Sequence, residues 1–173
     1  MNEFWLGGIK VIEHASLSFN QAYSSKRVST DHQMGDGGTI RQTLIGTENK
    51  LRTQINGWGW MPLNLAGLDY SQPMLLKCFD PRIVAGASET ITLPAARRSD
   101  AGYTPIGYAM VGDEEILTTI DNITDDVATL VTMPGATSYH VQYVPEITVL
   151  ATLTENYQSE PDRYYWTLDC VEV

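Results

Sequence analysis

The sequence has little charge, and basic residues are the scarcer kind. Of its 173 residues 18% are charged, and 21 acidic residues against 11 basic ones give a net charge of −10. Nucleic-acid backbones and anionic membrane surfaces both require clustered cations, so we expect no direct, sequence-specific nucleic-acid binding. No apolar run approaches the roughly 20 residues that cross a bilayer, and we expect no membrane insertion.

Cysteines and histidines are too few and too scattered to form a metal framework. Cys78 and Cys170 stand singly in apolar runs, which predicts two buried thiols. A disulfide between them would need their strands to lie side by side. A metal site would need two histidines to converge with a carboxylate, and we interpret His14, His32 and His140 as surface residues. We therefore predict no metal and no cofactor.

Sequence signatures of catalysis are also missing. Neither a GxSxG elbow nor an HExxH helix occurs, and the glycines at 35–38 lack the lysine and helix of a phosphate-binding loop. A group of carboxylates is interpreted as a solvated face, with calcium binding or paired-carboxylate hydrolysis as alternatives. These are Asp113, Glu114, Glu115, Asp121, Asp125 and Asp126. We predict no catalytic residues and no enzymatic activity.

Alternation of polar and apolar residues is the dominant pattern that is present. Tyr139, Val141 and Tyr143 fall on one face of their run, as half-buried strands require. The same period of two appears at 16–19, 89–93 and 164–173. This predicts an all-β fold, a sandwich or a barrel-like domain, with at most one or two short helices.

Turn signals separate these runs at short intervals. We predict a hairpin turn at 35–38 and further turns at Asn56-Gly57, Gly112-Asp113 and Pro134-Gly135. One short helical segment is expected within 61–68, where Pro62 suits the start and Gly67 the end. Asp and Asn residues at 119–126 favour a loop.

A change in composition predicts the domain layout. Residues 81–103 contain prolines and a polar stretch, and long strand-like runs resume at Tyr139. We predict a main β-domain formed by residues 1–80 and 139–173. Residues 81–138 would then be an inserted, β-rich lobe.

Two exposed basic residues are candidates for a protein interface. Alternation in the run 50–55 places Lys50 and Arg52 on one face of a strand. Such a face fits an acidic neighbouring subunit, and a simple solubility face is the alternative.

The second group of interface candidates follows directly in the sequence. Trp58 and Trp60 flank one glycine, and we interpret them as a structural corner with at least one ring in the core. A sugar-binding platform and a protein contact are the alternatives. Asp69 and Tyr70 complete the predicted interface residues.

Several stretches resemble small tail and baseplate proteins of tailed bacteriophages. In those proteins a glycine-containing turn leads into a strand with a basic residue, then into a Gly-rich corner that ends in Pro and a short Leu-containing segment. The resemblance covers about half of the chain and lies in the kinds of segments and their order. The stretches are residues 37–42, 50–62, 65–70, 139–149 and 165–169.

This resemblance implies a structural virion protein that assembles in the host cytoplasm into the tail or baseplate. The nearest roles are the distal-tail and the ripcord-like ring proteins, which connect the tail tube to the baseplate hub through protein–protein contacts. The implied partners are further copies in a cyclic ring, with a hexamer favoured, and tail tube, hub, sheath or wedge proteins. Alternatives are a carbohydrate- or receptor-binding β-module and a tail terminator or completion protein.

Overall fold

A computed structural model describes residues 2–14, 17–26, 29–43, 50–60, 62–158 and 163–173. Strands dominate these residues, and the single helix among them is the short α1 (Leu63–Ala66). The all-β prediction is confirmed. No helix in the described part of the chain is long and apolar enough to span a membrane.

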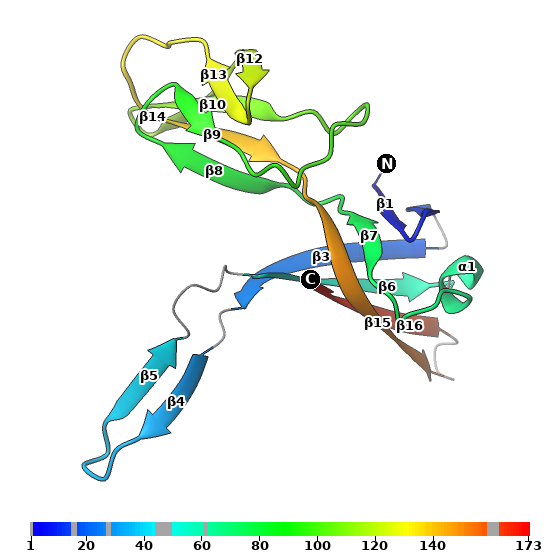
Figure 1. The fold of residues 1–173 in the computed structure, drawn as a ribbon. Coiled ribbons are helices and arrows are strands. Elements are labelled where there is room, and N and C mark those ends of the chain that lie inside the picture. The colour runs from blue at the N-terminus through cyan, green and yellow to red at the C-terminus, as the bar shows by residue number, and fades with distance from the viewer. Residues whose placement is uncertain (1, 15–16, 27–28, 44–49, 61, 159–162) are drawn as a thin grey trace. The chain divides into compact units, whose positions relative to one another are not determined.

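The chain divides into two compact units, and each is built from two separate segments. Unit 1 contains residues 1–12 and 75–147, and unit 2 contains residues 13–74 and 148–173. Figure 1 labels their elements along the chain. The division into these two units does not test whether residues 81–138 fold as an inserted lobe. The predicted domain layout therefore stays a prediction.

Unit 1 contains two antiparallel sheets, in the strand orders β11-β10-β14-β8 and β12-β13-β9. It also contains a group of three antiparallel strands in the order β2-β1-β7. The strands are β1 (Glu3–Leu6), β2 (Ile9–Ile12), β7 (Met74–Lys77, which begins one residue before the unit), β8 (Arg82–Gly86), β9 (Thr90–Thr92), β10 (Ile106–Val111), β11 (Glu114–Thr118), β12 (Ile120–Thr124), β13 (Val127–Leu130) and β14 (Ala136–Tyr143).

One buried core of unit 1 lies between the sheets β11-β10-β14-β8 and β12-β13-β9. Tyr139 and Val141 of β14 pack in one buried cluster with Ile91 of β9 and Leu130 of β13. These sheets approach closely at Gly107, where an added Cβ would lie 2.7 Å from a methyl group of Leu130. The predicted inward face of residues 139–143 is therefore confirmed.

Unit 2 is built on an antiparallel sheet in the order β15-β16-β6-β3. Its strands are β3 (Leu17–Lys26), β6 (Lys50–Gly59), β15 (Glu146–Gln158, whose first two residues belong to unit 1) and β16 (Arg163–Glu172). A separate pair, β4 (Ser29–Gln33) and β5 (Thr39–Thr43), lies between β3 and β6 in the sequence.

One face of the unit 2 sheet carries its buried side chains, as alternation along the strands predicts. Trp166, Leu168 and Cys170 of β16 are buried, and so are Leu51 and Ile55 of β6. The buried polar pair on this sheet is satisfied internally, because the amide of Gln21 donates to the hydroxyl of Thr53 at 2.8 Å.

Three predicted turns and the predicted helix are confirmed. The glycines at 35–38 connect β4 to β5, and Gly37 adopts a φ of 85° that favours glycine. Gly112 and Gly135 also occupy turns with positive φ. Helix α1 begins after Pro62 and ends at Gly67, within the segment proposed for it.

Two local predictions are wrong. Asn56 and Gly57 lie inside the long strand β6 instead of a turn, because the absent side chain at 57 makes room for a neighbouring ring. The segment 119–126 is mostly strand β12, paired with β13, and only Asp125 and Asp126 form the turn, with positive φ. Tertiary pairing here overrides local residue preference.

The prediction that Trp58 or Trp60 lies in the core is wrong, whereas the prediction of two buried thiols is confirmed. Trp58 is 47% exposed and Trp60 74% exposed, so neither ring enters the core. The buried tryptophan is Trp166. Both Cys78 and Cys170 are buried thiols, as their apolar surroundings predict.

Candidate functional site

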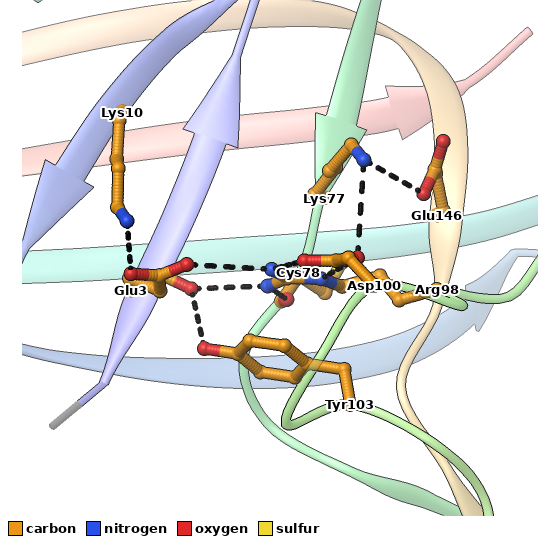
Figure 2. A network of polar contacts seen from close by, with 8 residues as sticks. All are labelled: Glu3, Lys10, Lys77, Cys78, Arg98, Asp100, Tyr103 and Glu146. Atoms are coloured by element: carbon orange, nitrogen blue, oxygen red, sulfur yellow. Dashed lines mark hydrogen bonds and ion pairs between the residues drawn. The ribbon is translucent and has the colours of Figure 1, made fainter.

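The most strongly charged internal cluster of unit 1 is centred on the fully buried Arg98 (Figure 2). The guanidinium donates to the carboxylate of Asp100 at 3.0 and 2.5 Å, and to the carbonyls of Cys78 at 2.6 Å and Glu3 at 3.1 Å. Its centre lies 3.3 Å from the ring centroid of Tyr103. Arg98 thus ties a loop to strand β1 and to the end of β7.

The charges around Arg98 compensate one another. Hydrogen bonding to Arg98 lowers the pKa of Asp100, although burial opposes it. Burial lowers the pKa of Arg98, but the hydrogen bond and charge of Asp100 outweigh it, and the pKa is raised. A hydrogen bond from Lys10 lowers the pKa of Glu3. Lys77 extends the cluster to Asp100 at 3.8 Å and also contacts Glu146.

A hollow of about 670 Å³ lies beside this cluster in unit 1. The ionisable residues in its lining are Glu3 and Lys10, which pair at 2.6 Å, and the tyrosines 103 and 143. Catalysis by proton transfer needs a carboxylate or amine that is available to substrate. Here the two charged groups compensate each other, so the geometry supports a structural role for the cluster.

The acidic residues and histidines in the described part of the chain do not gather into a metal site. Among the described residues no three histidine, cysteine or carboxylate side chains are grouped to hold a metal ion. His140 pairs with Glu115 and stacks on the ring of Tyr108 at 5.1 Å, with only 12% of its side chain exposed. His140 thus lies on the outward side of β14, as alternation predicts, but two neighbours partly cover it. Asp126 pairs with Arg97 at 2.7 Å.

The structure places three of the predicted interface residues on one face of unit 2. Lys50, Arg52 and Trp58 are all exposed on the outward face of β6, as alternation predicts. Trp58 lies directly opposite Tyr165 of β16, which is 38% exposed. Tyr165 was not among the predicted interface residues, because the sequence of one strand does not determine its pairing register with a distant strand.

The other three predicted residues lie after β6. Trp60 is the most exposed large apolar side chain among the described residues. Asp69 stabilises its own turn by accepting from the amide and hydroxyl of Ser71 at 3.0 and 2.6 Å, which lowers its pKa. Tyr70 donates its hydroxyl to the carbonyl of Leu65 at 2.7 Å, and burial raises its pKa to about 12. These two contacts are structural, and no contact with another molecule tests the interface prediction.

The strand pair β4–β5 forms an exposed arm, residues 29–43. Every side chain described in it, from Asp31 to Gln42, is exposed, including Met34 and Ile40. A bidentate pair of Arg41 and Asp31, at 2.7 and 2.9 Å, crosses its two strands. A two-stranded hairpin has little stability of its own in water, so the arm is suited to rest on another surface.

Unit 1 presents a second unpartnered surface, which we call the apolar face. It is the outward side of the sheet β11-β10-β14-β8, where Ile83, Ile106 and Leu117 are 63%, 44% and 64% exposed. Pairing with a common partner, Gln142, places Ile83 and Ile106 in one row across the sheet. Leu117 lies one row further, opposite Tyr108. Exposed apolar groups gathered in this way mark interaction surfaces.

No protein-family model, no curated protein and no solved structure matches the chain.

Proposed function

We propose that this chain is a structural protein of a bacteriophage tail, where it forms a ring that connects the tail tube to the baseplate hub. The observation that carries the proposal is the exposed arm at 29–43, a hairpin without a hydrophobic layer of its own in the described structure. The resemblance to small tail and baseplate proteins supports the same role. Its action is assembly, which needs no cofactor and no catalytic step.

Ring formation requires two different surfaces on each subunit, because contacts in a cyclic ring of more than two copies join unlike patches. The arm and the apolar face satisfy this requirement within one chain. The arm carries an internal pair between Asp31 and Arg41, and the apolar face carries one between Glu115 and His140. Contact between two copies can therefore bury these charges in pairs, which limits the cost of removing them from water.

The first test is the oligomeric state of the purified full chain by native mass spectrometry. We expect a closed ring, with a hexamer favoured. Leu117→Asp on the apolar face and Ile40→Asp on the arm should shift the ring toward monomers. Val131→Asp, an apolar residue 49% exposed and outside the apolar face, is the matched control. A chain that stays monomeric at every concentration and in the presence of tail tubes contradicts the proposal.

The position in the virion needs a second measurement. Quantitative mass spectrometry of purified particles of the parent phage should find about 6 or 12 copies for each tail, as a closed ring requires. Absence of the chain from particles contradicts a virion role. A tail terminator or completion protein would give similar copy numbers, so labelling of the chain in electron micrographs must decide which end of the tube carries it.

A further inference from the structure

The outward side of the unit 2 sheet is an extended polar field, which we call the polar face. It consists of every second residue along four neighbouring strands, at 18–24, 52–58, 150–156 and 165–171. None of these side chains is buried. Most are Ser, Thr, Asn or Gln, groups that both donate and accept hydrogen bonds.

Aromatic rings occupy one end of the polar face. Trp58 and Tyr165 lie opposite each other on β6 and β16, with exposed fractions of 47% and 38%. From Trp58 to Arg52 the face continues along β6 for about 20 Å, at about 3.4 Å for each residue. This length fits a chain-like ligand better than a single small ring.

A continuous hydrogen-bond network holds the polar side chains in place. The hydroxyl of Thr167 donates to Asn56 at 2.9 Å, and Asn56 donates to Gln54 at 3.3 Å. Gln54 in turn donates to Asp169 at 2.9 Å, and Arg52 reaches the same carboxylate oxygen at 3.4 Å. Each amide has a second N–H and further lone pairs beyond these bonds, so the network is a preorganised array that can also bind hydroxyl groups.

Between residues 52 and 58 of β6 the polar face is electrically balanced, although the whole chain carries −10. Its described charges within the bounds given above are those of Arg52 and Asp169, which pair with each other. Lys50 is the next outward residue of β6 beyond Arg52, and it donates to the carbonyl of Val173 at 3.0 Å. An anionic ligand such as a nucleic acid or a phosphate would need uncompensated cations here. The face therefore fits a neutral ligand that is rich in hydroxyl groups.

A hollow of about 340 Å³ lies at the end of the face that is remote from the aromatic rings. Arg52, Gln54 and Asp169 line it together with the small side chains of Ala22 and Ser24 on β3. The small residues leave room above the sheet, and the polar ones point donors and acceptors into it. This gives the face a second contact region besides the aromatic end.

We propose that the polar face is a binding site for a neutral, chain-like oligosaccharide. Trp58 and Tyr165 present apolar ring surface to the C–H groups of one sugar, and the Asn56–Gln54–Asp169 network binds hydroxyl groups of the following sugars. The site is independent of ring formation, since neither the arm nor the apolar face takes part in it. It assigns Arg52 and Trp58 to ligand binding instead of to a subunit contact.

The test uses the full chain with neutral probes of different linkage. Chitohexaose, cellohexaose and maltohexaose are titrated and followed by tryptophan fluorescence and calorimetry, and an array of neutral glycans extends the set. The variants are Trp58→Ala, Tyr165→Ala and Gln54→Ala. Trp60→Ala is the matched control, because this ring is 74% exposed and lies outside the polar face.

We expect saturable binding to at least one probe, weakened about tenfold or more by Trp58→Ala and unchanged by Trp60→Ala. Amide NMR shifts on binding should map to residues 52–58 and 165–171. The proposal is overturned if no probe binds up to about 10 mM. It is also overturned if Trp58→Ala and Trp60→Ala weaken binding equally, or if Trp58→Ala leaves sugar binding intact but dissociates the ring. Loss of the ring in Leu117→Asp with sugar binding retained separates the two proposals.

Discussion

Gly57 lies directly opposite Trp166 in the antiparallel pair of β6 and β16, and the indole ring occupies the space where a side chain at 57 would be. A Cβ on Gly57 would lie 2.0 Å from two ring atoms of Trp166, far inside contact distance. Trp166 is the largest fully buried side chain among the described residues, so the absence of a side chain at Gly57 is needed for the packing of the unit 2 core.

Gly57→Ala should lower the free energy of unfolding by about 2–3 kcal/mol, because the overpacked ring must leave its place. Denaturant unfolding of the variant and the parent chain measures the difference. Gly35→Ala is the control, since no atom lies within 4 Å of the added Cβ there. Equal stability of both variants would show that the ring moves aside without cost.

Arg98→Met should destabilise unit 1 by about 3 kcal/mol, since it leaves the carboxylate of Asp100 without its buried partner. The figure is at the low end of the range for buried pairs because the Asp100 side chain is 35% exposed. Arg41→Met is the matched control: it removes another bidentate Arg–Asp pair, but an exposed one, and should leave stability unchanged. Both are measured by denaturant unfolding, and comparable losses in the two variants would contradict the structural role of the cluster.

Stability should fall in acid because of the carboxylates that surround Arg98. The folded pKa values of Asp100 and Glu3 lie below their ordinary values of 3.8 and 4.5. The unfolded chain therefore takes up protons first as the pH falls. This stabilisation is complete above about pH 5 and is lost as the pH drops through the lowered values. Unfolding measured from pH 7 to pH 2 should show a shallower decline in Asp100→Asn, and an unchanged decline would exclude Asp100 as a source.

Tyr70 should make the protein sensitive to alkali. Its pKa is raised from 10.0 to about 12, so the unfolded chain loses this proton first and the folded state loses stability as the pH rises through that interval. Tyr70→Phe should flatten the decline, and at neutral pH it should cost about 1 kcal/mol for the lost bond to Leu65. Tyr157→Phe, at a residue 53% exposed, is the control for both readouts. Identical alkaline profiles for the two variants would contradict the assignment to Tyr70.

Local sequence patterns were sufficient for the all-β class, several strands and turns and the short helix. Alternation along 139–144 and 164–173 separated the two faces of each strand, since side chains in a strand point to opposite sides with a period of two. The glycines at 35–38 and the Pro62–Gly67 pair act through backbone conformations of a few residues. Such signals do not depend on what lies elsewhere in the chain.

The candidate sites required the tertiary structure. Gly57 resembles a turn residue in sequence, and only the register of β6 against β16 shows that it accommodates Trp166. The same register places Tyr165 beside Trp58. Arg98 is a polar loop residue by sequence, yet its partners Glu3 in β1 and Cys78 just after β7 come from distant parts of the chain. Composition and alternation were thus enough to determine that the chain is all-β and that the outward faces of its strands are mainly polar. Which of those faces are aromatic, charged or apolar was decided by long-range strand pairing, because each strand contributes only one row to a surface that several strands share.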